Sequence, residues 1–165
     1  MGTIDSPRFI VDQNVGKLAR WLRMMGYDTR LFSGDNDSHM VALAQKEDRV
    51  ILTRDTQIMK RRVVTSGQVT AILIEDDEPE RQIRQVITTL NLDPQSRPFS
   101  LCLECNYPLV AKSKTEVADL VPPYVFRTQS HYMACPRCHR IYWRGTHWQA
   151  MTEKLKAFMR DLTGD

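Results

Sequence analysis

Two short apolar segments, each closed by an aspartate, constrain the fold of this chain more than any other feature. Phe9-Ile10-Val11 runs directly into Asp12, and Val50-Ile51-Leu52 is followed by Asp55 after two intervening residues. Both runs are too short and too uniformly apolar for amphipathic elements, but they suit strands buried on both faces. Ligands bind at the carboxyl ends of the strands in an open parallel sheet. We therefore expect Asp12 and Asp55 to face one crevice, where their carboxylates suit a hard cation such as Mg²⁺ or Mn²⁺.

Strand and helix patterns alternate through the first 95 residues. Strands are predicted at residues 8–12, 28–32, 50–53 and 69–74, and helices at residues 14–26, 37–48, 57–62 and 80–90. This alternation implies right-handed crossovers and a mostly parallel sheet between helices, an α/β/α sandwich. Gly26 is expected to end the first helix, and Asp37 to be the N-cap of the second. Asp55 has a structural alternative to metal binding, because it can cap the helix that follows it.

The chain changes character after a linker rich in proline and polar residues at 93–98. All four cysteines lie beyond it, in two Cys-x-x-Cys pairs that 29 residues separate: Cys102 with Cys105, and Cys135 with Cys138. Two such knuckles are typical of a closed structural Zn²⁺ site. Short β-type runs such as Tyr124-Val125-Phe126 lie between them, which favours a small zinc ribbon that metal binding holds together.

Three other interpretations of the cysteines compete with zinc. Cys135 to His139 also fits a c-type haem attachment pattern, but haem leaves the first pair unexplained. A thioredoxin-type redox pair needs a different context of strand and helix, and two disulfides need an oxidising compartment.

Cationic and aromatic residues follow the second knuckle, at positions 140–148. Such side chains stack on nucleobases and pair with phosphates. Tyr142 and Trp143 are equally suited to packing within the ribbon, so Arg144 and His147 are the better surface candidates. A final helix is predicted at residues 149–162, with its buried side formed by Met151, Leu155, Phe158, Met159 and Leu162.

Charge and hydropathy add limited constraints. Residues 1–95 carry 13 Lys and Arg against 14 Asp and Glu, and residues 96–165 carry 10 against 6. Bulk charge is therefore weak evidence for nucleic-acid binding, and local patches must carry that argument. Lys17, Arg20 and Arg23 form such a stripe on the first helix, either as a solvated face or as phosphate ligands near Asp12. No apolar run is long enough to span a membrane, so we expect a soluble, cytoplasmic protein without membrane contact.

The order of these motifs resembles the Mut-seven C-terminal RNase family. The resemblance rests on residues 8–12, 16–23, 26–29 and 52–55, on the two cysteine knuckles, and on residues 142–148. Members are described as PIN-like nuclease domains fused to a zinc ribbon. The resemblance therefore implies a PIN-like domain at residues 1–95, and a zinc ribbon with a terminal helix at residues 96–165.

The resemblance also implies a function, a metal-dependent ribonuclease whose catalytic, metal-binding acids match Asp12, Asp37 and Asp55. Asp35 is an alternative to Asp37. A fourth acid, which PIN domains usually have, would be Asp76 or Asp77. Cleavage of single-stranded or structured RNA is expected to leave 5′-phosphate and 3′-hydroxyl ends. The expected RNA contacts come from six residues: Lys17, Arg20, Arg23, Arg54, Arg144 and His147.

Two other functions remain open at this stage. In one, the sandwich is a non-catalytic platform, and the ribbon and the basic helix bind RNA. In the other, Asp12 is the nucleophile of a phosphotransfer enzyme, although the chain lacks the Asp-x-Asp loop of such hydrolases.

Overall fold

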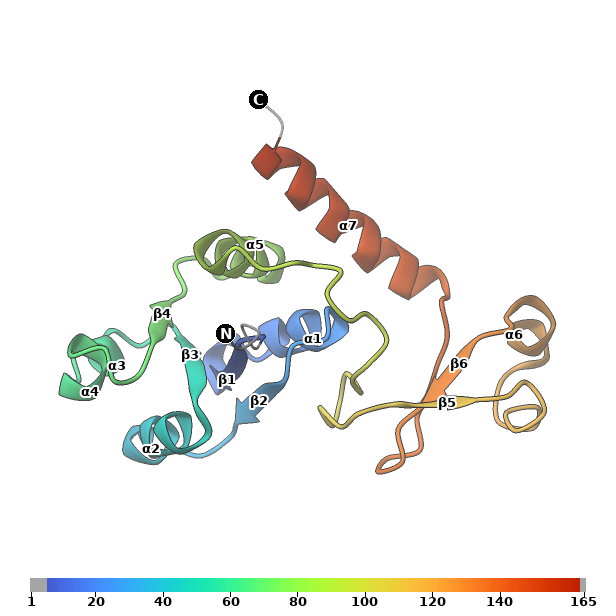
Figure 1. Ribbon diagram of the computed structural model, residues 1–165, viewed down its shortest axis with the longest axis horizontal. Helices are drawn as coiled ribbons and strands as arrows, with labels where there is room; N and C mark the ends of the chain where they lie inside the picture. Colours follow the sequence, from blue (N-terminus) through green and yellow to red (C-terminus); the bar gives the residue numbers. More distant parts are fainter. Residues whose placement is uncertain (1–5, 164–165) are drawn as a thin grey trace, which may run out of the picture.

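A parallel sheet of four strands forms the first part of the molecule (Figure 1). The computed structural model describes residues 6–163, and their side chains as far as residue 161. The strands are β1 (Arg8–Asp12), β2 (Thr29–Phe32), β3 (Arg49–Thr53) and β4 (Ala71–Leu73), in the order β2-β1-β3-β4. All three pairings are parallel. This confirms the predicted α/β fold.

Helices cover both faces of the sheet. The helices of the described chain are η1 (Gln13–Val15), α1 (Lys17–Met24), α2 (Asp37–Glu47), α3 (Thr56–Met59), α4 (Arg62–Thr65), α5 (Pro79–Leu90), α6 (Pro123–Thr128), which lies outside this sheet, and α7 (Thr146–Thr163). Buried residues of α1, α5 and α7 form one core with the sheet, and those of α2 and α3 form a second core on the other face. Two covered faces explain why the central strands are apolar at successive positions.

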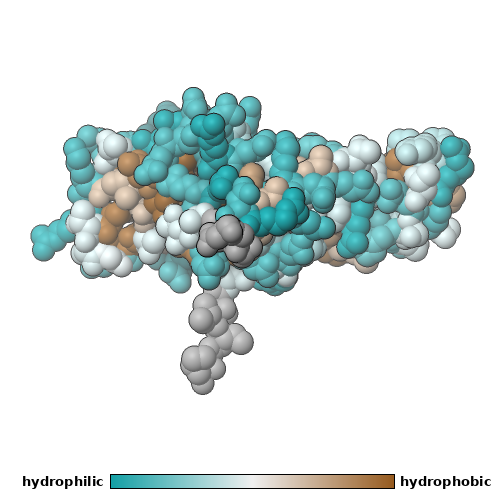
Figure 2. All heavy atoms as spheres, turned by 90° about the horizontal axis from the view of Figure 1, so that it is seen from above, coloured by the Kyte–Doolittle hydropathy of each residue, from teal (hydrophilic) through white to brown (hydrophobic). Residues whose placement is uncertain are grey.

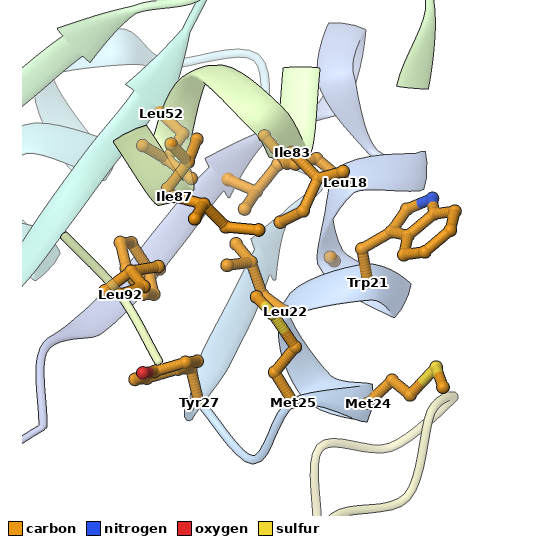
Figure 3. Packing of buried hydrophobic residues seen from close by; sticks show 14 of the residues in the cluster. Leu18, Trp21, Leu22, Met24, Met25, Tyr27, Leu52, Ile83, Ile87 and Leu92 are labelled. Atoms are coloured by element: carbon orange, nitrogen blue, oxygen red, sulfur yellow. The ribbon is translucent and has the colours of Figure 1, made fainter. Parts of the chain in front are cut away.

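The alternation of side chains along the central strands distributes them between the two cores. Phe9 and Val11 of β1 belong to the core of α1 and α5, while Ile10 between them belongs to the core of α2. Figure 3 shows the first core at close range, with Leu18 and Leu22 of α1 lying towards Ile83 of α5. The outer surface is mostly hydrophilic in the view of Figure 2, with apolar atoms visible over parts of the sheet region.

Gly26 ends α1 as the sequence predicts. Its φ of 96° is left-handed, and the bonds from Gly26 N–H to Arg23 O and from Tyr27 N–H to Leu22 O form a Schellman motif. A Cβ at Gly26 would lie only 2.4 Å from the carbonyl oxygen of Arg97. Both the dihedral angle and the close packing therefore require glycine here.

Four local predictions are wrong. The helix expected at residues 57–62 is split into α3 and α4. The run at residues 124–126 is not a strand but lies in α6, because Pro123 in the first turn favours a helix start. Asp37 does not cap α2: Asn36 is the N-cap, and its side chain accepts a hydrogen bond from His39 N–H. The last helix also begins earlier than expected, at Thr146.

The second part of the molecule is a small antiparallel sheet around the cysteines. Its strands are β5 (Val110–Lys112), β6 (Tyr132–Ala134) and β7 (Ile141–Tyr142), with β6 in the centre. A separate small core forms around Val117, Val125 and Tyr132. The cysteines lie in the turns next to these strands, as in the predicted ribbon.

A buried arginine joins the two parts. Arg23, on α1, donates from Nε to Thr29 O at 2.9 Å and from Nη1 to Leu103 O at 2.8 Å. Asn106 adds a second link, because its Oδ1 accepts from Thr29 N–H at 2.9 Å and its Nδ2 donates to Asp28 at 2.7 Å. The first knuckle is thus fixed against α1 and against the edge strand β2, whose backbone it covers.

The C-terminal helix returns to the first part of the molecule. Met151 and Leu155 of α7 are buried in the core that α1 and α5 form, and Phe158 and Met159 pack against it partly buried. No helix within the described residues is long and apolar enough to cross a membrane.

We predict that Arg23→Met destabilises the zinc-loaded protein by about 3 kcal/mol, because it leaves buried carbonyl groups without their donor. Lys17→Met is the matched control, since Lys17 is an exposed cation on the same helix. Urea unfolding at equilibrium measures both variants. Equal free energies of unfolding for the two would contradict a structural role for Arg23.

Candidate active site and metal centre

Three aspartates from separate segments meet at the carboxyl end of the sheet. Asp12 is the last residue of β1, Asp55 follows β3 after one intervening residue, and Asp37 is the first residue of α2. The adjacent strands β1 and β3 are parallel, with Val11 opposite Leu52. Their carboxyl ends therefore lie side by side, and each strand brings one acid to the same edge.

Thr53 connects two of these acids. Its side chain is fully buried, and its Oγ1 donates to Asp12 Oδ2 at 2.8 Å while accepting from Asp55 N–H at 3.0 Å. Asp55 also caps α3, because its Oδ1 accepts from Gln57 N–H at 2.8 Å. Asp55 therefore caps α3 and also belongs to the acid cluster. Sequence reasoning missed Thr53, although a hydroxyl residue two positions before a strand-end acid was a visible signal.

Asp37 lies among like charges. Burial raises the pKa of its carboxyl, and so do a hydrogen bond with the Asp55 carboxyl and the charges of Asp55 and Asp12. Because Asn36 caps the helix, the Asp37 carboxyl is not engaged as the N-cap. Asp35, the alternative in this loop, is exposed.

Arg61 is the cation that acts on this cluster. Its positive charge acts against the burial and the neighbouring carboxylates, so the rise in the pKa of Asp37 is smaller than it would be without Arg61. Its Nη1 donates to Ser38 Oγ at 2.9 Å, on the residue next to Asp37. Sequence reasoning did not single out Arg61, because its position between α3 and α4 brings it to α2 only in the folded chain.

The predicted RNA-binding cations are distributed more widely. Lys17 and Arg54 are exposed, at the start of α1 and directly before Asp55. Arg20 pairs with Glu104 of the first knuckle at 2.5 Å, and Arg23 is buried beside it. Arg144 and His147 are exposed near the start of α7. Two of the six thus lie near the acids, and the others lie at or near the ribbon.

The carboxylates are chemically suited to a divalent cation. Hard oxygen ligands are those that Mg²⁺ and Mn²⁺ prefer. Among the described residues, however, the cysteines form the one group of three or more ligand atoms that all lie within 4.8 Å of one another. The three aspartates do not form a second such group among these residues.

The four cysteine sulfurs form a compact cluster with the spacing of a zinc site. All four are free thiols, and the Sγ atoms of Cys102 and Cys138 are 3.7 Å apart. A tetrahedron with Zn–S bonds of about 2.3 Å has edges of about 3.8 Å. The four donors therefore fit one Zn²⁺, and the same separation is far too long for a disulfide bond.

The two knuckles have the same local geometry. In each, the backbone N–H of the second cysteine points at the sulfur of the first at 3.4 Å, as in Cys105 to Cys102 and Cys138 to Cys135. The next residue, Asn106 or His139, has a left-handed φ of 61° or 67°. This turn directs the paired sulfurs to one side, where a metal can bind both.

The cysteine thiols strongly shift one another's pKa values. A hydrogen bond with Cys138 and burial raise the pKa of Cys105 to about 12, whereas hydrogen bonds from Arg140 lower that of Cys138 to about 6. Four thiols at this spacing cannot all ionise unless a cation compensates them. The hydroxyl of Tyr142 lies 3.1 Å from the sulfur of Cys102 and accepts from Leu103 N–H, so it orients the first knuckle.

A profile of the Mut7-C RNAse domain matches residues 7–155, a range that includes the acids and both knuckles. The chain belongs to this family. Comparison with curated proteins and with solved structures gave no significant match. Membership in the Mut7-C family indicates an RNase domain and hence RNA as the substrate.

We predict that Asp37→Asn stabilises the metal-free Mut7-C domain at pH 7, raising its melting temperature by up to about 2 °C. The ordinary pKa of the carboxyl is 3.8, and the folded protein raises it. The stability that protonated Asp37 contributes is complete below this value and is lost as the pH rises through the folded pKa. The advantage of the variant should therefore appear above pH 4 and vanish below it.

Asp35→Asn is the control, since it removes the same charge from an exposed position two residues away. It should leave the melting temperature unchanged. A clear drop for Asp37→Asn would mean that the favourable interaction of an acid with the first turn of α2 outweighs the repulsion.

We predict one zinc per chain by elemental analysis, and its loss in Cys135→Ser. That loss should lower the melting temperature by at least about 10 °C, since zinc binding holds both knuckles together. His139→Asn should retain zinc, because asparagine tolerates a left-handed backbone. Loss of zinc from His139→Asn, with zinc retained in Cys135→Ser, would contradict a four-cysteine site.

Proposed function

We propose that this chain is a metal-dependent ribonuclease that hydrolyses RNA phosphodiester bonds at the Asp12, Asp37 and Asp55 cluster. The observation that carries the proposal is the meeting of three acids from three separate segments, in a chain that belongs to an RNase family. Like charges that raise the pKa of a carboxyl, at the carboxyl end of a parallel sheet, are typical of functional sites.

The three carboxylates would hold Mg²⁺ or Mn²⁺. One carboxylate oxygen of Asp12 is fixed by Thr53, and one of Asp55 by Gln57. These contacts set the direction of the remaining oxygens. When bound, a divalent cation supplies a more acidic water for in-line attack and offsets the charge that develops on the departing oxygen. When water attacks the phosphorus and the 3′ oxygen departs, taking up a proton, the products carry 5′-phosphate and 3′-hydroxyl ends.

The other residues near the cluster position the RNA backbone. Lys17 and Arg54 are exposed on either side of the acids, in the segments that follow Asp12 and precede Asp55. Their charges attract phosphates without reading sequence. Arg20, Arg144 and His147 extend this cationic surface towards the ribbon. Arg23 is excluded from this role, since its guanidinium is buried against backbone carbonyls.

We predict that Asp12→Asn, Asp37→Asn and Asp55→Asn each reduce Mn²⁺-dependent cleavage of single-stranded RNA by at least about 100-fold. Asparagine keeps the side-chain shape and can replace Asp55 as an N-cap, so folding should be preserved. Cleavage is followed on labelled RNA with and without added Mn²⁺, and phosphatase sensitivity identifies the product ends.

Asp35→Asn is the matched control and should cleave like the parent protein. Parent-like cleavage by Asp12→Asn and Asp55→Asn would reject the proposed site. RNA binding that is indifferent to these changes and to Mg²⁺, with no cleavage by the parent, would instead favour a non-catalytic RNA-binding module.

A further inference from the structure

An apolar pocket of about 320 Å³ lies where α1, the first knuckle, β7 and the start of α7 meet. Aromatic side chains form much of its lining, and they come from segments far apart in the sequence: Phe99, Tyr142, Trp143 and Trp148. Its volume is at the lower end for ligand pockets, which suits a single planar ring system. Nothing in the acid cluster or the cysteine cluster requires this pocket.

Basic side chains surround the pocket. Arg20 and His147 belong to its lining, and both are accessible to solvent. Arg144 is held next to it, with its guanidinium carbon 5.2 Å from the ring centre of Trp148 and 5.7 Å from that of Phe99. Aromatic walls with cations at the edge match the chemistry of a nucleotide, whose base stacks and whose phosphate is anionic.

One face of α1 connects this pocket with the acids. Lys17, Arg20 and Met24 are spaced three and four residues apart, so they share one face of the helix. Lys17 is at the end of α1 that follows Asp12, and Met24 lines the pocket. Lys17 and Met24 are seven positions apart, which corresponds to about 10 Å along the helix axis. A short extended stretch of RNA can span this distance.

We propose that the pocket binds one nucleobase of the RNA substrate, displaced along the strand from the bond that is cut. This inference rests on the proposed ribonuclease function. The base stacks against the aromatic wall that includes Trp143, and the flanking phosphates lie against Arg20 and Arg144. Arg20 then exchanges its partner Glu104 for a phosphate. Because every base has an aromatic face, this site increases affinity without selecting a sequence.

The first experiment uses the unaltered, zinc-loaded protein and needs no cleavage. Adenosine 5′-monophosphate and ribose 5-phosphate are titrated separately, and the indole N–H resonances of Trp143 and Trp148 are followed by NMR. We expect saturable shifts with adenosine 5′-monophosphate and none with ribose 5-phosphate, since only the former carries a base. Equal responses to both compounds, or no response to either, would overturn the proposal.

The second experiment measures the affinity for a short unstructured RNA by fluorescence anisotropy, without added divalent cation. Trp143→Leu should weaken binding about ten-fold through the loss of stacking. Tyr124→Leu is the matched control, because Tyr124 is an aromatic residue of the same module that is 66% exposed and outside the pocket. It should bind like the parent protein.

Unchanged RNA binding in Trp143→Leu would reject the pocket as a base site. Concentration-dependent dimerisation that RNA does not reverse would also reject the pocket as a base site. A second copy of the chain would then be the partner that covers the pocket. Both experiments read binding alone, so they stand apart from the fate of the proposed catalytic acids. Binding of adenosine 5′-monophosphate together with RNA cleavage by Asp55→Asn would support the pocket and reject the catalytic site. No binding together with loss of cleavage in Asp55→Asn would reject the pocket and support the catalytic site.

Discussion

The parallel pairing of β1 with β3 is the constraint on which the rest of the site depends. Both strands are buried on two faces, so a shift of one residue would move every side chain to the opposite core. The register is therefore fixed by packing, and with it the positions at which the two strands end. Asp12 and Asp55 then lie side by side because hydrophobic burial places their backbones there. Thr53 adds local precision through its buried hydroxyl.

The link through Arg23 makes the two parts of the molecule depend on each other. The first knuckle faces the sulfurs of the second knuckle on one side, and on the other side it is held by hydrogen bonds that involve Arg23 and Asn106. A metal in the cysteine cluster therefore fixes the loop against which α1 packs. Since α1 also carries Lys17 and Arg20, the geometry of the cationic face is coupled to the ribbon. Zinc bound by the four cysteines would therefore support α1 as well as the small antiparallel sheet.

Local patterns were sufficient to predict much of this fold, and long-range contacts explain what they missed. Uniformly apolar runs and Cys-x-x-Cys spacing are signals contained within a few residues, and both led to the right elements. Arg23 was interpreted as part of a cationic stripe, because two of its acceptors, Leu103 O and Glu104 O, lie 80 and 81 residues further along the chain. Arg61 was overlooked for the same reason. The side chains of residues 124–126 favour a strand, but Pro123 in the first turn of α6 favours a helix, and the segment is helical.

The electrostatics of the acid cluster argue for a functional origin. Asp37 is kept among like charges that raise its pKa, although a neutral residue at the same position would avoid the repulsion. A purely structural platform gains only the interaction of an acid with the first turn of α2, since Asn36 and Asp55 already provide the helix caps. Natural sequences retain such local conflicts mainly at functional sites. A divalent cation is the simplest species that converts the repulsion into attraction, and a phosphate backbone is the natural neighbour of the cations that surround it.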